Sequence, residues 1–133
     1  MNVGGGCITA VVPETVGLPA EYFLIRGIFL DTRGPLMIDA ESVWGFRVMV
    51  LTQGHDISNG VVGAVVDKGV VVEKGAWIGS GALLNNCHIR EGAIVAAGAV
   101  VRSQTVEPYT MVEGNPARVI KRWDEARREW ARV

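Results

Sequence analysis

Histidine is the first residue type to consider for chemistry, because this chain of 133 residues contains only two. His55 lies in the stretch VLTQGHDIS, between a glycine and an aspartate, directly after an apolar run. An imidazole has an unperturbed pKa of about 6.5 and can take a proton from a hydroxyl group near neutral pH. A lone histidine at a turn is also often just a solvated polar residue. The residue type leaves both interpretations open, and the elements around His55 must decide between them.

The two cysteines and the histidine count bear on other kinds of chemistry. Cys7 and Cys87 form no Cys-x-x-Cys pair, so we expect two free thiols in a reducing cytoplasm. We expect Cys87 to be buried as a small hydrophobe and Cys7 to lie outside the regular part of the chain. A covalent acyl-cysteine route is therefore not expected. A catalytic zinc ion normally takes three protein ligands, so two histidines predict no metal site.

Composition and charge limit the possible classes of protein. The length predicts a single domain, and the net charge of −1 gives no general electrostatic attraction to nucleic acid or to an anionic membrane. No apolar run reaches the roughly 18 residues of a membrane span. The first residues lack the basic and apolar regions of a signal peptide. We therefore predict a cytoplasmic protein without nucleic-acid partners and without a membrane span.

Large apolar residues recur every six positions along the middle of the chain. Three series show this period: Ile38, Trp44, Val50; then Val72, Ile78, Leu84; then Ile89, Val95, Val101. Four positions after these residues the side chain is usually small or modest, as in Ser42, Val48, Gly54, Ala76, Ala82, Ala93, Ala99 and Thr105. A period of six fits neither an amphipathic helix nor a plain strand. It predicts a coil with three flat sides, in which the large and the small residue of each hexapeptide point inward.

Stacked coils of this kind form a parallel β-helix. With three hexapeptides in each coil of 18 residues, region 28–112 allows about four coils. An excursion loop at about 56–70 interrupts the period. The step from Leu84 to Ile89 is one residue short, which places His88 at a corner. So short a stack leaves flat sides uncovered, so we expect it to associate with further copies.

The two ends of the chain lack the period. Residues 1–27 form an N-terminal segment, in which 18–26 is a short helix or strand. Residues 113–133 are predicted to form a loop and a short C-terminal α-helix. Within it, Trp123, Ala126, Trp130 and Val133 have helical spacing and would make an apolar packing stripe.

Four motifs now identify a resemblance: TQGHD, EKGAWIGSGA, EGAIVAAGAVV and EPYTMVEGNPARVIKRW. Over residues 28–122 the chain resembles the hexapeptide-repeat acyltransferases, and among them the O-acetyltransferases of sugars such as galactoside, maltose and exopolysaccharide. The resemblance implies an all-β, left-handed parallel β-helix. It also implies a homotrimer with active sites between subunits, acetyl-CoA as co-substrate, and a small-molecule or saccharide acceptor.

The resemblance also assigns roles to residues that match the family's motifs. His55 matches the histidine that acts as general base. Trp77 and Ser80 match the residues beside the acetyl and pantetheine end of coenzyme A, with the Ser80 N–H holding the thioester oxygen. Ala97 matches a backbone contact to pantetheine.

The nucleotide end of coenzyme A would be met by basic residues. Arg118 and Lys121 match the family's phosphate contacts. Arg102 stands with Ser103 where many relatives have Thr-Lys, so we expect Arg102 to substitute in the contacts there. On the acceptor side, Asp31 is a candidate from its place in LDTRGP, without a family motif.

These observations favour transfer of an acetyl group from acetyl-CoA directly to a sugar hydroxyl. Three alternatives stay open. They are N-acetylation of an amino sugar, a non-catalytic β-helix scaffold, and a zinc enzyme like the carbonic anhydrase of this fold, which the count of two histidines disfavours.

Overall fold

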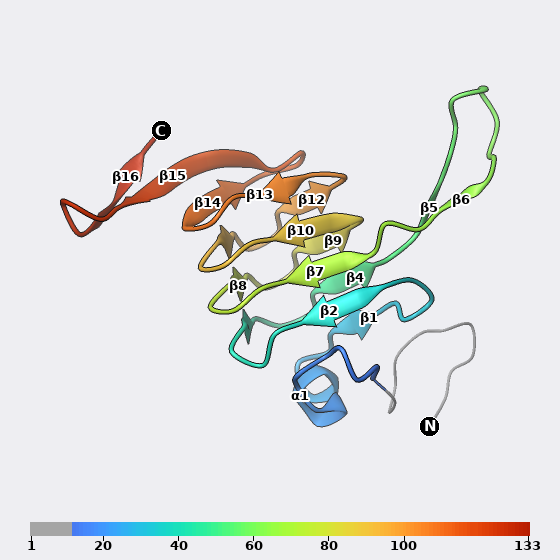
Figure 1. Cartoon of the computed structure of the whole chain (residues 1–133), viewed down its shortest axis with the longest axis horizontal. Coiled ribbons are helices and arrows are strands. Elements are labelled where there is room, and N and C mark those ends of the chain that lie inside the picture. Colours follow the sequence, from blue (N-terminus) through green and yellow to red (C-terminus); the bar gives the residue numbers. More distant parts are fainter. Residues whose placement is uncertain (1–11) are drawn as a thin grey trace.

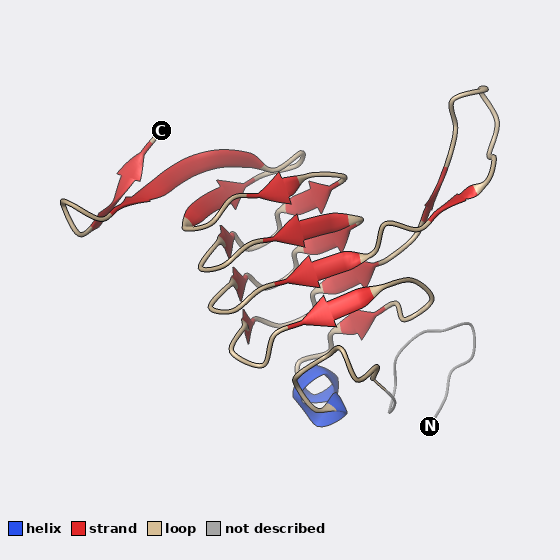
Figure 2. Cartoon of the chain, in the orientation of Figure 1, coloured by secondary structure: helices blue, strands red, loops and turns tan. Residues whose placement is uncertain are grey.

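The computed structural model describes residues 12–133, and these are built almost entirely from β-strands. Within that range one helix is present, α1 (Ala20–Ile25), with six residues (Figure 2). The all-β prediction is confirmed. Residues 1–11, with Cys7, lie outside the described part, and so does the first portion of the predicted N-terminal segment.

Three parallel sheets form the body of the molecule, and the chain visits them in turn (Figure 1). Side one consists of β1 (Phe29–Leu30), β4 (Met49–Leu51), β9 (Leu83–Asn85) and β12 (Val100–Arg102). Side two consists of β2 (Leu36–Ile38), β7 (Val70–Val72), β10 (Cys87–Ile89) and β13 (Thr105–Val106). Side three begins with β3 (Val43–Trp44), β8 (Trp77–Ile78), β11 (Ile94–Val95) and β14 (Thr110–Glu113). The chain passes these sides four times, which confirms the predicted four coils.

One large apolar side chain from each side of each coil points into the core. The three columns are Leu30, Val50, Leu84 and Val101; Ile38, Val72, Ile89 and Val106; and Trp44, Ile78, Val95 and Val112, all at most 3% exposed. The small residues Ala76, Ala82, Ala93 and Ala99 are equally buried. The prediction of inward large and small residues is confirmed for these positions. It is wrong for Gly54 and Thr105, which do not point inward.

The coils of the regular part contain 17 residues rather than 18. Trp77 pairs with Ile94, and Leu83 pairs with Val100. The corner between sides one and two is one residue shorter than the other two corners. A single residue with positive φ makes the turn there: Asn86, with a φ of 46°, and Ser103, with a φ of 52°. The step from Leu84 to Ile89, which is one residue shorter than the period of six, is therefore the regular length at this corner. Asn86 occupies the corner, and His88 lies within β10 instead of at the corner predicted for it.

The core is closed at both ends of the stack. Below the first coil, α1 places Phe23 fully inside, with its ring edge-to-face against Trp44 at 5.7 Å between centroids. Above the last coil, Ala117 is 1% exposed and its N–H donates to the Val100 carbonyl. Segment 18–26, for which helix and strand were both open, is thus largely helix.

One hairpin leaves the stack at the corner between sides one and two of the second coil (Figure 1). It consists of β5 (Gly54–His55) and β6 (Val65–Val66), which pair in antiparallel register. The predicted excursion loop is present, and it begins before the expected residue 56, because His55 already lies in its first strand.

A second hairpin replaces the predicted C-terminal helix. β15 (Arg118–Asp124) pairs antiparallel with β14, and β16 (Glu129–Arg132) pairs antiparallel with β15, so both extend side three. Trp123 and Trp130 lie directly opposite each other. The helix prediction is wrong because a spacing of seven residues fits two structures. It places both tryptophans on one face of a helix, but it also places them opposite each other across a short hairpin turn. β14 is an open sheet edge with backbone groups to satisfy, and that favours the strand.

Among residues 12–133, none of the helical structure has the length and apolar character needed to cross a membrane.

A glycine substitution in the hairpin turn distinguishes a hairpin from a helix, because it should stabilise the one and destabilise the other. Arg128 has a φ of 56°, a conformation that costs a non-glycine residue about 1–2 kcal/mol. Arg128→Gly should therefore stabilise the hairpin by roughly 1 kcal/mol, whereas glycine inside a helix would cost about as much. Amide hydrogen exchange over residues 118–132 measures this. Arg127→Gly, at a neighbouring position without positive φ, is the control and should speed exchange.

Candidate functional site

His55 projects from the stack on the first strand of the excursion hairpin. Its Nδ1 lies 3.1 Å from the carbonyl oxygen of Gly63 on the returning arm. A carbonyl can only accept a hydrogen bond, so this contact requires the proton on Nδ1. In the neutral ring the lone pair then resides on Nε2, the tautomer in which this nitrogen can accept a proton. Asp56 does not take part, because its carboxylate accepts the Ser58 N–H, which lowers the pKa of Asp56.

Two asparagines of the next coil hold both ends of this hairpin. The Asn85 amide donates to the carbonyls of Leu51 and Gln53, each at 3.1 Å, where the chain leaves the stack. The Asn86 side-chain oxygen accepts the Gly69 N–H, where the chain returns. Sequence analysis missed this function, although the adjacent pair in LLNNCH, opposite an insertion one coil earlier, was a usable signal. Asn85 and Asn86 position the hairpin and, through it, His55.

Asp31 supports the same corner from the coil below. Its carboxylate is 1% exposed and accepts bonds from the Arg33 side chain and backbone and from the Thr52 N–H. Burial alone would raise the pKa of Asp31, but these donors outweigh it and lower the pKa from 3.8 to about 2. Both oxygens are thus engaged inside the protein, which argues against the predicted contact of Asp31 with an acceptor.

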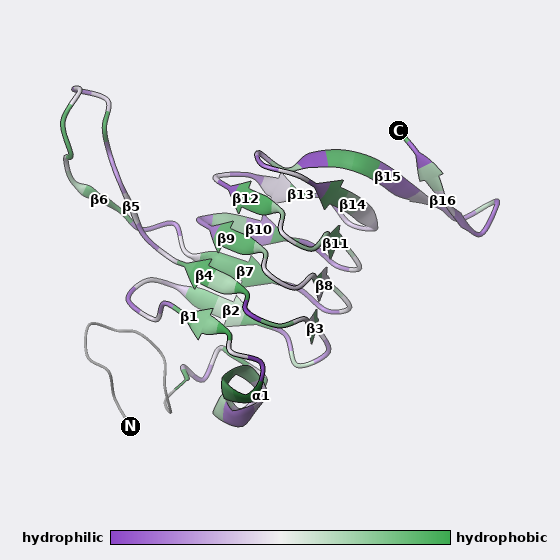
Figure 3. Cartoon of the chain, turned by 180° about the vertical axis from the view of Figure 1, so that it is seen from behind, coloured by the Kyte–Doolittle hydropathy of each residue, from purple (hydrophilic) through white to green (hydrophobic). Residues whose placement is uncertain are grey.

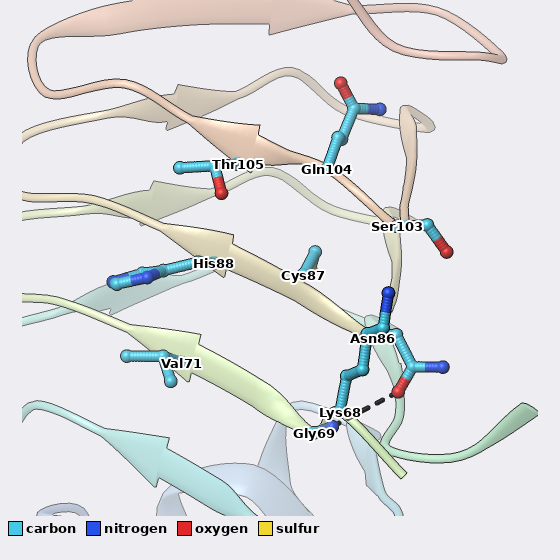
Figure 4. Close-up of a pocket in the computed structure, with 9 residues that line it drawn as sticks. All are labelled: Lys68, Gly69, Val71, Asn86, Cys87, His88, Ser103, Gln104 and Thr105. Carbon is cyan, nitrogen blue, oxygen red and sulfur yellow. Dashed lines mark hydrogen bonds between the residues drawn. The ribbon is translucent and has the colours of Figure 1, made fainter. Parts of the chain in front are cut away.

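Two hollows flank the ridge that Asn86 and Ser103 form at this corner. One, of about 440 Å³, is lined by His55 and Arg102, together with Gly54, Ile57, Val66 and Asn85. The other, of about 290 Å³, opens on side two, where Lys68 and His88 line it (Figure 4). Arg102, predicted for the coenzyme, therefore shares a cavity with the candidate base.

Cys87 and His88 have structural environments that explain them without catalysis. Cys87 is a free thiol, 6% exposed, and burial raises its pKa to about 12. The thiolate is therefore not accessible near neutral pH, and the predicted buried role of Cys87 is confirmed. The His88 Nε2 is hydrogen-bonded to the carboxylate of Glu73, which directly follows the neighbouring strand β7.

The predicted donor residues gather at a different corner, between sides three and one. Ser80 and Ala97 occupy equivalent places in consecutive coils, and both are exposed. Within residues 12–133, neither the Ser80 N–H nor the Ala97 N–H is taken by an acceptor, while the Ser80 hydroxyl accepts the Phe46 N–H. Two unused backbone donors thus stand one strand step, about 4.8 Å, apart.

The close approach of the coils at this corner depends on glycine. A Cβ on Gly45 would lie 2.6 Å from the Ser80 nitrogen, and one on Gly79 would lie 2.5 Å from the Ala97 nitrogen. A larger residue in place of Gly45 or Gly79 would therefore push neighbouring coils apart at the Ser80 and Ala97 N–H groups.

Trp77 and the basic residues share the outer face of side three. The Trp77 side chain is 51% exposed. Strand pairing places it in one row with three further residues, in the order Ile94, Met111 and Lys121. A register shift in β15 brings Arg118, opposite Glu113, onto the same face as Lys121. The structure thus groups Trp77, Arg118 and Lys121 on one side of the molecule.

Within one chain the predicted residues form two groups. His55 and Arg102 lie at the corner between sides one and two, while Ser80 and Ala97 lie at the corner between sides three and one. Trp77, Arg118 and Lys121 lie on side three, which borders the second of these corners. The candidate base and the candidate donor-binding residues therefore lie at different corners of one chain.

No family model matches the sequence, and no curated protein matches it either. Among solved structures, a maltose O-acetyltransferase from Clostridium difficile 630 is 28% identical, with a TM-score of 0.60, over 68% of this chain and 49% of that protein. A hexapeptide-repeat-containing acetyltransferase from Vibrio cholerae is also 28% identical, with a TM-score of 0.62, over 74% and 56% of the two chains. The chain has the fold of the hexapeptide-repeat acetyltransferases.

This fold confirms the resemblance seen in the motifs. An N-acyltransferase from Bacillus cereus, solved with dTDP and coenzyme A, shares the fold at 22% identity and a TM-score of 0.57, over 70% of this chain and 55% of that one. Another structure of the Vibrio acetyltransferase contains acetyl coenzyme A. The chain described here spans about half the length of these solved proteins.

In the described part of the chain, no three His, Cys, Asp or Glu side chains lie close enough together to hold a metal ion.

The buried carboxylate of Asp31 predicts a defined response to acid. Because its pKa in the folded state is about 2, below the ordinary 3.8, the stability it contributes is complete above pH 4 and is lost as pH falls toward 2. Asp31→Asn should lower stability at neutral pH and reduce the loss between pH 4 and 2. Denaturant titrations at each pH measure both effects. Arg33→Gln should act in the same direction, and an unchanged acid profile in both variants would contradict this role.

Proposed function

We propose that this protein transfers an acetyl group from acetyl-CoA to a hydroxyl group of a sugar or sugar-containing acceptor. The observation that carries the proposal is the His55 contact with Gly63, which leaves the Nε2 lone pair of the neutral ring beside a cavity of about 440 Å³ and so supports a role of His55 as general base. The fold and the acetyl-CoA-bound relative support the donor. Left-handed winding of the coils, implied by the resemblance, is part of the same proposal.

The reaction proceeds by direct transfer. Nε2 of His55 takes the hydroxyl proton as the oxygen attacks the thioester carbonyl carbon. The developing oxyanion is stabilised by the unused Ser80 N–H. The carbon–sulfur bond then breaks, and the coenzyme A thiolate receives the proton from the imidazolium. The products are the acetyl ester and free coenzyme A, with no covalent enzyme intermediate, in keeping with the buried Cys87.

The remaining assignments concern the donor. Trp77 lies beside the acetyl end, and the Ala97 N–H binds the pantetheine amide. Arg118 and Lys121 bind phosphate groups as charge-assisted donors. Arg102, on the opposite wall, reaches the coenzyme from the subunit that supplies His55.

We further propose a homotrimer in which each active site lies between two subunits. The two groups of residues lie at different corners of one chain, and a three-fold ring brings unlike corners of neighbours together. The outer faces support this, since Met37, Val43 and Met49 on three sides are between 43% and 54% exposed. A reducing, cytoplasmic setting agrees with the unpaired Cys87.

N-acetylation of an amino sugar is the second candidate. The N-acyltransferase from Bacillus cereus supports N-acetylation only through its shared fold. A screen of hydroxyl and amino sugars with acetyl-CoA, following thiol release and the mass of the product, distinguishes the two.

Loss of the base should abolish most of the activity without unfolding the protein. His55→Ala should lower kcat about 100-fold or more, which is the scale of general-base catalysis. The exposed position of His55 on a hairpin makes a folding defect unexpected. Asp56→Asn, beside it in sequence, is the matched control and should retain turnover. Near-normal turnover of His55→Ala would remove the assignment.

Mixed assemblies test whether the site is shared. His55→Ala and the Arg118→Glu/Lys121→Glu pair should each be inactive at low acetyl-CoA. Unfolded together in equal amounts and refolded, they should recover roughly one quarter of wild-type activity, because each mixed ring contains one intact cleft. Mixed trimers without recovery would place both halves of the site in the same subunit. Monomers in solution would contradict the ring itself.

A further inference from the structure

The cavity on side two lies directly across the Asn86–Ser103 ridge from the cavity that His55 lines (Figure 4). Asn86 and Ser103 line both cavities, so a ridge made of one corner residue from each coil is all that separates them. The cavity on side two has a volume of about 290 Å³. This is just below the range of about 300–1,000 Å³ that holds a whole small molecule. It therefore suits one group of a ligand whose remainder occupies the cavity beside His55.

Most side chains that line the cavity on side two are polar and are not engaged by the protein itself. An ammonium group, two hydroxyl groups and an amide line it, from Lys68, Ser103, Thr105 and Gln104. Within residues 12–133, no hydrogen bond or ion pair involves any of these four side chains. Polar groups that converge on one hollow can fix the orientation of a polar ligand.

The charge of this cavity favours an anion. Its lining includes Lys68 and His88 but no carboxylate. The Glu73 carboxylate is engaged by the His88 Nε2 and does not line the cavity. The carboxylate of Asp67, next to Lys68 in sequence, points to Gly34 in the coil below. An ammonium group that lacks a carboxylate partner can bind a carboxylate or phosphate of a ligand through a charge-assisted hydrogen bond.

The excursion hairpin fixes Lys68 and His55 relative to each other. His55 lies on the strand that leaves the stack, and Lys68 lies where the chain returns, directly before Gly69. The Asn86 side chain accepts the Gly69 N–H and so holds the returning arm. Figure 3 shows this hairpin projecting from the corner of the stack, and in Figure 4 the Lys68 side chain points toward the Asn86–Ser103 ridge. The candidate base and the cation thus line the hollows on opposite sides of that ridge.

We propose that the cavity on side two binds an anionic group of the acceptor, with Lys68 as its charged partner, while the hydroxyl to be acetylated lies at His55. This inference rests on the proposed function, and it makes the acceptor an acidic saccharide. The carboxylate of a uronic acid and the phosphate of a sugar phosphate present the same chemistry to Lys68. The side chains of Gln104 and Thr105 bind hydroxyl groups beside the anion.

The direct test measures binding of D-glucuronate and D-glucose by NMR, without catalysis. Glucuronate should shift the backbone amide signals of Lys68, Gln104 and Thr105, and glucose should bind about 10-fold more weakly because it lacks the carboxylate. Lys68→Gln should weaken glucuronate binding about 10-fold or more, the scale of a lost charge-assisted hydrogen bond. Because Lys68 is exposed, the fold should be unaffected. Lys74→Gln, at the other end of β7 where Lys74 pairs with Glu41 at 3.4 Å, is the matched control and should bind as the wild type does.

Inorganic phosphate is the second probe, and it identifies the source of the anion. Phosphate that binds more tightly than glucuronate, and depends on Lys68, would support a phosphorylated sugar as the acceptor. Glucuronate that binds more tightly would support a uronic acid. Binding of both anions to Lys68→Gln with wild-type affinity, or no shift of these amide signals with either anion, would overturn the inference.

Turnover separates this inference from the proposed function. The wild-type protein should show a lower KM for an acidic disaccharide, cellobiouronic acid, than for neutral cellobiose, and Lys68→Gln should remove that difference. Turnover with equal KM values in the wild-type protein would overturn the inference and leave the proposed function intact. Glucuronate binding that depends on Lys68, without turnover of any sugar, would contradict the proposed function and keep the anion site. A raised KM for acetyl-CoA in Lys68→Gln would mean that the cavity serves the donor and that the inference is wrong.

Discussion

The stacking of inward side chains in three columns is the constraint on which the rest of the structure depends. Each coil contributes one large residue from each side, so coils must remain in register to fill the core without voids. A shift of one residue along any side would move its whole apolar set outward. The small alanines behind the large residues let neighbouring sides approach. This requirement leaves only the corners free to vary in length, because their residues do not enter the columns.

The candidate functional residues accordingly lie at the corners. At the corner between sides one and two, residues with a left-handed backbone conformation, such as Asn86, make a short turn. In the second coil the same corner contains a whole hairpin instead. Insertion does not disturb the core because Asn85 and Asn86 satisfy the backbone at both ends of the hairpin. Asp31 and Thr52 stabilise the coil below. A candidate base on a projecting hairpin is thus supported by a rigid scaffold.

The corner between sides three and one uses the same stack in a different way. There the Ser80 and Ala97 backbone N–H groups remain without an acceptor among residues 12–133. Gly45 and Gly79 permit the tight approach that lines them up. Beyond the last coil, β15 and β16 continue side three and extend its outer face. One fold therefore carries His55 at one corner and two unused backbone N–H groups at another, and the proposed ring of subunits would bring these two corners together.

The sequence by itself determined the repeat, the inward residues, the four coils, the buried Cys87 and the family that the motifs resemble, because these follow from side-chain size recurring at a fixed interval. Tertiary structure decided what depends on partners distant in sequence. The 17-residue coil became visible only through strand register, and the engaged state of Asp31 only through its contacts with Arg33 and Thr52. The C-terminal strands were decided by the open edge of β14, because the spacing of Trp123 and Trp130 suits a helix and a hairpin alike.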